Sequence, residues 1–239
     1  MKIKFEKYES GGNDFVLIDN RNKLYDLNSD KIKKICTRNF GVGSDGLIIL
    51  KNSKIADFKM IYYNSDGQSS SLCGNGTRCL FSFTLSLGII KKIAKIETSE
   101  GIYIATISNR NLVSLKMKDI DDILLFDNKA CLNSGSPHHV EMIEDLNKIS
   151  VKNMGSSIRF SRRYSPYGTN VNFFKKINDK KFEIRTYERG VEDETLSCGT
   201  GATAVAIAVH AMGLTTQSEI IIQTKGGELI ISFETSATG

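Results

Sequence analysis

Two cysteines in this 239-residue chain stand in nearly the same local sequence. Cys73 is followed by Gly-Asn-Gly and by an apolar-rich run at residues 80–87, and Cys198 by Gly-Thr-Gly and a second run at residues 202–212. A cysteine placed where a loop becomes a helix can do chemistry, because the helix dipole favours a thiolate and first-turn amides hold anions. A single Cys-Gly is more often a buried structural cysteine. The second copy favours a chemical role.

The likeness between the halves extends beyond these motifs. Each cysteine lies fifteen residues before a glycine, Gly88 or Gly213, that ends the apolar run. Residues 96–101 and 222–227 then open into alternating strands, and we interpret residues 170–174 as a counterpart of residues 12–16. The pattern indicates one structural unit used twice.

The elements that position the cysteines follow from hydrophobic patterning. A helix that is apolar all round is buried all round, so each post-cysteine helix is expected inside a curled sheet. Strands are expected at residues 98–115 and 220–233, a helix capped by residues 28–30, and a loop at residues 159–167. We predict an α+β fold of two pseudo-symmetric domains, 1–117 and 118–239, each a mixed, curled sheet wrapped around a central apolar helix.

Composition narrows the class of protein. Apolar residues make up 40% of the chain and charged residues 25%, as in soluble globular proteins. The net charge of +5 comes from scattered, mostly lysine side chains, which predicts a solvated surface and no nucleic-acid partner. No run is long enough to span a membrane, and the first residues lack a signal-peptide core, so a cytoplasmic location is predicted.

No metal or cofactor is expected. The five cysteines include no Cys-x-x-Cys pair, which argues against a disulfide framework and a structural zinc site. His138 and His139 are adjacent, and neighbouring side chains in a strand point to opposite faces. No pyridoxal, flavin or nucleotide motif is seen.

Two thiols that face one cleft would suit proton transfer at the α-carbon of an amino acid. A thiolate on one side removes the proton and a thiol on the other side returns one, which inverts the centre. Two sets of helix-terminal amides would hold the substrate carboxylate as negative charge spreads into it. The sequence therefore predicts an isomerase that acts on a small molecule.

Over nearly the whole chain, the motifs resemble those of the diaminopimelate epimerase family. The matching segments, in order, are Gly12-Asn13-Asp14-Phe15, Gly41-Val42-Gly43-Ser44-Asp45-Gly46, Asn64-Ser65-Asp66-Gly67, Cys73-Gly74-Asn75-Gly76-Thr77-Arg78-Cys79, Glu188-Arg189-Gly190 and Glu194-Thr195-Leu196-Ser197-Cys198-Gly199-Thr200-Gly201. The resemblance implies a cofactor-independent epimerase that interconverts LL- and meso-diaminopimelate in lysine and peptidoglycan-precursor biosynthesis. It also allows a homodimer.

The resemblance also implies roles for single residues. Cys73 and Cys198 would be the two catalytic acid/bases. His138 and Glu188 would tune the acidity of the thiols, and Arg189 would suit a distal carboxylate because its guanidinium is planar. The implied substrate-binding residues are Asn13, Asn64, Gly74, Asn75, Asn170, Glu188, Arg189, Gly199 and Thr200.

The chain departs from the family pattern in a few places. Some members carry glutamine at the position of Gly46 and asparagine at that of Ser136, and the loop at residues 191–194 is one residue longer than the commonest form. Family members usually continue beyond the position of Gly239 into a further strand.

Other readings remain open. One is a proline-racemase-like isomerase that uses two cysteines in the same way on a different substrate. Another is a binding protein of the same fold with inert thiols. A basic nucleic-acid binder is a more distant third.

Overall fold

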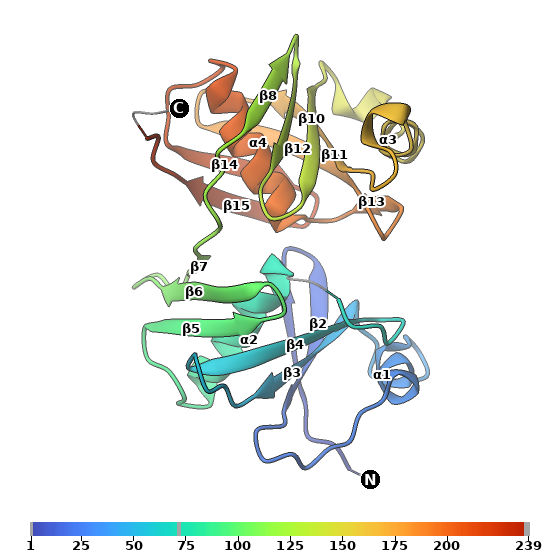
Figure 1. The fold of residues 1–239 in the computed structure, drawn as a ribbon, viewed down its shortest axis with the longest axis vertical. Helices are drawn as coiled ribbons and strands as arrows, with labels where there is room; N and C mark the ends of the chain where they lie inside the picture. The colour runs from blue at the N-terminus through green and yellow to red at the C-terminus, as the bar shows by residue number, and fades with distance from the viewer. Residues whose placement is uncertain (1, 71–72, 237–239) are drawn as a thin grey trace. The chain divides into compact units, whose positions relative to one another are not determined.

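The computed structural model describes residues 2–70 and 73–236. The chain divides into two compact units, residues 1–116 and 117–239 (Figure 1). Each unit holds a mixed sheet with one apolar helix against its inner face, as the alternation of strands and apolar runs predicts.

In the described part of the first unit, seven strands form one sheet in sequence order. The pairs β2/β3 and β4/β5 are parallel and the other neighbouring pairs are antiparallel. The strands are β1 (Glu6–Ser10), β2 (Asn13–Asp19), β3 (Gly46–Lys51), β4 (Phe58–Asn64), β5 (Ile93–Thr98), β6 (Gly101–Ile107) and β7 (Val113–Leu115).

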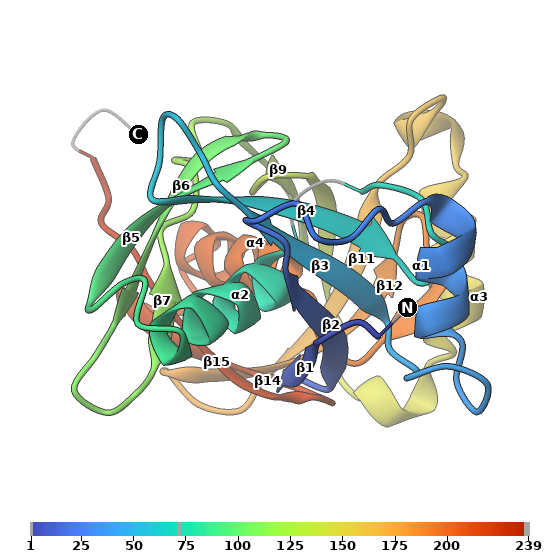
Figure 2. The same cartoon turned by 90° about the horizontal axis from the view of Figure 1, so that it is seen from below.

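Helix α2 (Gly74–Ser86) lies within the curve of this sheet, as Figure 2 shows. Its Leu80 and Phe81 are fully buried and pack with Phe15 and Ile48 of β2 and β3. Helix α1 (Ser29–Cys36) covers the other face, and its N-terminus is capped by the Asn28 side chain, which accepts a bond from the Lys31 amide. The predicted helix capped by residues 28–30 is thus confirmed.

The second unit repeats this plan with a sheet in the order β15-β14-β12-β11-β10-β9-β8, and β13 pairs with β12. Helix α4 (Gly199–Ala211) packs on one face and α3 (Val151–Arg159) on the other. The strands are β8 (Ile123–Phe126), β9 (Lys129–Asn133), β10 (Pro137–Met142), β11 (Asn170–Lys176), β12 (Lys181–Glu188), β13 (Asp193–Thr195), β14 (Glu219–Thr224) and β15 (Gly227–Ser232), with 3-10 turns η1 (Leu146–Lys148) and η2 (Arg162–Tyr164).

The helices α2 and α4 are built alike. Each has 13 residues, begins after a cysteine N-cap, and ends before a glycine in the left-handed region, Gly88 at φ 69° and Gly213 at φ 71°. Glycine adopts this conformation without the steric penalty that other residues incur, so it ends both helices in the same way. The predicted repeat of the cysteine helix is confirmed.

The upstream part of the predicted repeat was wrong in register. Strand pairing makes β2/β3/β4 equivalent to β10/β11/β12, so Asn13 corresponds to the start of β10 and not to Asn170. Gly46 and Asn170 each begin the second strand of the set, and their partners on the third strand are Asn64 and, by extension of the β11/β12 register, Glu188. The match between short segments aligned the two halves incorrectly. Strand pairing, and not local sequence similarity, determines which residues of the two units are equivalent.

Helix α3 was not expected from the sequence, and the segment taken as a loop from residue 159 begins at its last residue. Ser150 caps α3 by accepting a bond from the Asn153 amide, and Val151 and Gly155 are buried against β11 and β12. Gly155 allows the close approach, since a Cβ atom there would overlap the Cβ and Cγ atoms of Tyr187.

Among the described residues, no helix has both the length and the apolar character needed to cross a membrane.

The packing of α3 gives a stability prediction. On an open helix surface Gly→Ala stabilises by about 1 kcal/mol, but overpacking a core contact costs about 1–3 kcal/mol. Gly155→Ala should therefore destabilise the protein, because Tyr187 Cβ is anchored to the backbone and cannot move aside. Ser157→Ala, at an exposed position of the same helix, is the control and should be neutral. Urea unfolding measures both, and a Gly155→Ala variant as stable as the parent would contradict the packing.

Candidate active site

Cys73 is the N-cap of α2, at the position where the sequence predicted a loop-to-helix junction. Its sulfur accepts a bond from the Gly76 amide at 3.4 Å, and its thiol donates to Asn13 Oδ1 at 3.8 Å. The sulfur therefore lies at the positive end of the helix dipole, which stabilises a thiolate. The structure brings Cys73 and Asn13 together.

A charged network orients Asn13. Asn13 Nδ2 donates to Asp45 Oδ2 at 2.9 Å, and Arg38 donates to Asp45 and to Asp14, each at 2.8 Å. Burial raises the pKa of Asp14, but hydrogen bonds from Arg38 and Lys7 outweigh it and hold that pKa well below its usual range. Asp14 is therefore ionised at neutral pH, and because Asn13 Nδ2 faces Asp45, the Asn13 carbonyl is turned toward Cys73.

Arg78 is a residue to which the sequence analysis gave no role. It donates to Ser10 Oγ at 3.1 Å and to Asn75 Oδ1, one turn earlier on α2. Burial lowers the pKa of Arg78, and its electrostatic interaction with the thiol groups of Cys73 and Cys79 opposes this only in part. The Asn75 side chain is buried and its Oδ1 accepts from Arg78, while its backbone amide lies in the first turn of α2, where amides can hold an anion.

Asn64 and Gly46 are direct partners at the ends of β4 and β3. Asn64 is exposed, and the Tyr62 ring lies against Gly46, where an added Cβ would come within 2.6 Å of Tyr62 Cε2. The ring fills the space that a larger side chain at position 46 would need. In this chain, therefore, a glutamine at position 46 would require Tyr62 to move.

Cys198 repeats the arrangement of Cys73 with different neighbours. It is the N-cap of α4, and its sulfur accepts a bond from the Gly201 amide at 3.4 Å. The Thr200 hydroxyl lies 3.4 Å from the sulfur, and Cys198 is 7% exposed. Both of these contacts are with uncharged groups, a backbone amide and a hydroxyl.

His138 reaches Cys198 through the Thr200 hydroxyl. Asn172 Nδ2 donates to His138 Nδ1 at 2.9 Å, and the other Asn172 contacts, with the His139 carbonyl and the Thr186 hydroxyl, fix its amide orientation. His138 Nδ1 is therefore an acceptor, and Nε2 carries the proton 3.0 Å from Thr200 Oγ1. Burial, with a smaller effect of the Arg189 charge, lowers the pKa of His138 to about 3.

Asn170 joins the turn before β10 to the end of β12. Its Nδ2 donates to Ser136 Oγ at 3.0 Å and to the Pro137 carbonyl at 3.1 Å, and its Oδ1 accepts from the Arg189 amide at 2.9 Å. Both amide protons are thus used within the protein, which leaves one acceptor position for any ligand. Ser136 also contacts His138 and Thr200, so it is part of the site despite its departure from the family pattern.

Glu188 and Arg189 follow each other at the end of β12. Burial raises the pKa of Glu188, and the nearby Thr195 side chain opposes that rise only in part. Arg189 Nη1 donates to the Tyr167 carbonyl at 3.3 Å. The second unit therefore places Thr200 and His138 around the Cys198 thiol, and Asn170 is joined to the backbone of Arg189 at the end of β12.

Gly76 and Gly201 let the two helix N-termini approach their sheets. A Cβ at Gly76 would lie 2.8 Å from Ile48 Cδ1, and a Cβ at Gly201 would overlap Asn172 Oδ1. In Cys-Gly-x-Gly the second glycine is therefore a packing requirement. Gly201 also leaves room for the Asn172 side-chain amide, which orients His138.

The histidine pair does not form a metal site. His138 faces Thr200, whereas His139 faces Tyr164 on the other side of β10. Among the described residues, no group of three or more His, Cys, Asp or Glu side chains is placed to hold a metal ion.

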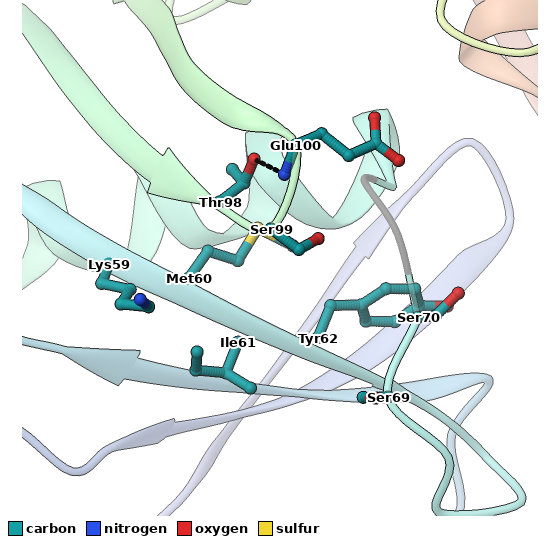
Figure 3. Close-up of a pocket in the computed structure, with 9 residues that line it drawn as sticks. All are labelled: Lys59, Met60, Ile61, Tyr62, Ser69, Ser70, Thr98, Ser99 and Glu100. Atoms are coloured by element: carbon teal, nitrogen blue, oxygen red, sulfur yellow. Dashed lines mark hydrogen bonds between the residues drawn. The ribbon is translucent and has the colours of Figure 1, made fainter.

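A separate surface pocket in the first unit is lined by Lys59, Met60, Ile61, Tyr62, Ser69, Ser70, Thr98, Ser99 and Glu100 (Figure 3). Hydroxyl groups form much of its rim, and Thr98 Oγ1 is tied to the Glu100 amide at 3.1 Å. It includes none of the residues that the sequence predicted as catalytic or substrate-binding. In each unit, the candidate functional residues are the cysteine N-cap and its partners, and not the residues of this pocket.

Comparison with known proteins identifies the family. A sequence model of the family described as diaminopimelate epimerase matches residues 5–120 and 130–238. The chain belongs to this family. A diaminopimelate epimerase of Flavobacterium psychrophilum is 49% identical over 232 residues, which cover 97% of this chain and 91% of that protein. The diaminopimelate epimerase of Aquifex aeolicus is 37% identical, with 95% and 88% covered.

Solved structures share the fold. A phenazine biosynthesis protein of the PhzF family from Bacillus anthracis superimposes with a TM-score of 0.70 at 15% identity, covering 95% of this chain and 88% of that one. A probable proline racemase from Agrobacterium radiobacter gives 0.66 at 18% identity, with 100% and 87% covered. At these identities the match shows the fold alone, and it confirms the predicted α+β architecture of this epimerase-family chain.

The His138 network predicts a fixed charge and tautomer. Burial disfavours the imidazolium, so the His138 ring should stay neutral, with Nε2 protonated, from about pH 8 down to about pH 5. An ordinary histidine, in contrast, titrates near 6.5. The buried neutral ring stabilises the fold above pH 6.5 and loses that contribution as the pH falls from there toward 3. Nitrogen NMR of the histidine side chains measures both properties. A midpoint near 6.5, or a proton on Nδ1, would contradict the network.

Proposed function

We propose that this protein is a diaminopimelate epimerase that interconverts LL- and meso-diaminopimelate with Cys73 and Cys198 as its two acid/bases. One observation carries the proposal: the two thiols are equivalent N-caps of equivalent helices, in a chain of this family. Each is held by the amide three residues later at 3.4 Å. The proposal requires the two units to present these thiols to opposite faces of one α-carbon.

The reaction needs one base and one acid at a time. One cysteine, as a thiolate, takes the α-proton, and the other, as a thiol, gives a proton to the opposite face. The product has the inverted configuration and the two sulfurs have exchanged their protonation states. The reverse reaction therefore begins from the state that the forward reaction leaves.

The α-carboxylate is assigned to the helix N-termini. The amides of Gly74, Asn75, Gly199 and Thr200 lie in the first turns of α2 and α4, where backbone N–H groups lack acceptors within the helix. As the proton leaves, charge spreads from the α-carbon into the carboxylate. Fixed amide dipoles then stabilise the transition state more than the ground state, which is the requirement for catalysis.

The environments of the two thiols support different ways of holding a negative sulfur. Beside Cys198, the Thr200 hydroxyl can donate to the thiolate while it accepts from His138 Nε2, which carries the proton of the neutral ring because Asn172 donates to Nδ1. Beside Cys73, the Arg78 cation lies close enough for its charge to interact with the sulfur. Glu188, with its raised pKa, is assigned with His138 to control the protonation of the second thiol.

The distal end of the substrate is assigned to polar side chains at the strand ends. Arg189 provides a planar guanidinium for the second carboxylate, and its backbone is fixed by Asn170. Asn13 and Asn64 offer amide groups for the ammonium and carboxylate groups. This set favours a dicarboxylic diamino acid over proline, which has no distal carboxylate.

The remaining assignments rest on the family. Diaminopimelate stands in lysine and peptidoglycan-precursor biosynthesis, and we place the protein there, in the cytoplasm and without a cofactor. The homodimer stays a prediction.

Single substitutions at the two thiols test the proposal. Cys73→Ser and Cys198→Ser should each lose about 10²–10⁴-fold in the rate of epimerisation, because a hydroxyl is a far weaker acid than a thiol. Cys36→Ala, at a buried cysteine of α1 outside the site, is the control and should retain the parental rate. Chromatographic resolution of LL- and meso-diaminopimelate gives the rates. Near-parental epimerisation by either serine variant would refute the two-base mechanism.

A further inference from the structure

A second cluster of reactive side chains lies on the outer face of the sheet in the second unit. Cys131 of β9 and His139 of β10 are direct cross-strand partners, so their side chains share a face. Their neighbours Ala130 and Val140 point the other way, into the core beneath α4. Cys131 is thus on the side of the sheet opposite α4, whose N-cap is Cys198, and the proposed mechanism does not use it.

Short contacts connect this thiol to a base. Cys131 Sγ lies 2.8 Å from Tyr164 Oη, and Tyr164 Oη lies 2.7 Å from His139 Nδ1. His139 Nε2 is 3.1 Å from Glu141 Oε2, and Lys129 pairs with the other Glu141 oxygen at 3.0 Å. A nucleophile, a base and an orienting carboxylate are therefore in line, with a phenol hydroxyl between the first two.

The proton count in this chain allows two states that fit the same contacts. In the neutral state, Cys131 donates to Tyr164, Tyr164 donates to His139 Nδ1, and His139 Nε2 donates to Glu141. When one proton moves along the chain, His139 becomes an imidazolium that donates at both nitrogens, and Tyr164 donates to a Cys131 thiolate. Since no hydrogen bond is lost in either state, the tyrosine is a relay between thiol and base.

The charges around the cluster favour the ionised state. The groups that face Cys131 are His139 from β10, and Tyr164 and Arg163 from η2, and the His139 ring in turn faces Glu141. Burial raises the pKa of the Cys131 thiol, but its interactions with His139, Tyr164 and Arg163 outweigh this and bring the pKa below its ordinary value. Burial lowers the pKa of His139, yet Cys131 and Glu141 raise it overall.

Access separates Cys131 from the other cysteines outside the proposed site. Cys131 is partly exposed, whereas Cys36 and Cys79 are 2% and 3% exposed. Burial raises the pKa of Cys36 and, more strongly, that of Cys79, to about 12. The two buried thiols therefore serve as internal references in the same chain.

We propose that Cys131, activated by His139 through Tyr164, is a nucleophilic thiol and a modification site for peroxides on the outer face of this sheet. The thiolate sulfur attacks one peroxide oxygen and the O–O bond breaks. The departing oxygen takes the relay proton from His139 by way of Tyr164. Cys131 becomes a sulfenic acid, oxidised by two electrons, and hydrogen peroxide is reduced to water.

The test measures alkylation and oxidation of each cysteine in the full-length protein, so its result does not depend on the proposed epimerase activity. Iodoacetamide labelling at a series of pH values, followed by peptide mass spectrometry, gives a rate profile for each cysteine. The Cys131 profile should have its midpoint below about 8.5, the value of an ordinary thiol, and Cys131 should react faster at neutral pH than Cys36 and Cys79. Hydrogen peroxide with dimedone should trap a sulfenic acid at Cys131 ahead of those two.

Two variants test the relay. Tyr164→Phe keeps the ring and removes the hydroxyl, and His139→Gln removes the base, so each should move the Cys131 midpoint upward by about one pH unit, a tenfold slower reaction at neutral pH. Tyr167→Phe, at an exposed tyrosine of the same segment, should leave the profile unchanged. The proposal is overturned if the parental Cys131 midpoint is 8.5 or higher, or if both relay variants keep the parental profile.

Discussion

Each unit places a cysteine sulfur at the N-terminus of a buried helix, and the polar side chains described around it depend on that position. Cysteine is not among the favoured N-cap residues, and sulfur is a weak hydrogen-bond acceptor. The helices α2 and α4 can nevertheless begin there because apolar burial of Leu80, Phe81 and their counterparts on α4, and not the cap, stabilises them. Serine or aspartate at this N-cap position would stabilise the helix more than cysteine does. The chain has a thiol there instead, at the positive end of the helix dipole.

The two cysteine sites share a backbone plan and differ in their chemistry. Near Cys73 the supporting groups are charged: Arg38 bridges two carboxylates that hold Asn13, and Arg78 lies close to the sulfur. Near Cys198 the hydrogen-bonded chain that reaches the sulfur consists of uncharged groups: Thr200, a neutral His138 and Asn172. Duplication of one unit explains the common geometry. The different neighbours suit a substrate that presents different groups to its two sides.

Much of this arrangement could be predicted from sequence because its signals are local. The cysteine N-caps, the closing glycines Gly88 and Gly213, and the Asn28 cap of α1 each depend on residues within one helix. Helix α3 was missed because it is short and carries a glycine and two serines, which are typical of turns. Its stability comes from contact with Tyr187, which is distant in sequence.

The polar networks around the cysteines could not be predicted from local sequence either, because their members are distant from one another in the chain. His138 meets Asn172 and Thr200 only through the parallel pairing of β10 with β11 and the entry of α4. The incorrect match of residues 12–16 with residues 170–174 shows the same limit. The strand register makes Asn170 equivalent to Gly46 in the repeat. The Cys131 relay likewise depends on the β9/β10 register.

The central claim, that two thiols act on opposite faces of one carbon, is tested most directly by the first turnovers of the parental enzyme in heavy water. Starting from LL-diaminopimelate, the donating thiol carries solvent deuterium while the accepting thiol takes substrate hydrogen. The account predicts that, at early times, deuterium appears at the α-carbon of the meso product and is absent from recovered LL substrate. Equal early labelling of substrate and product would show that a single base serves both faces, and would contradict the account.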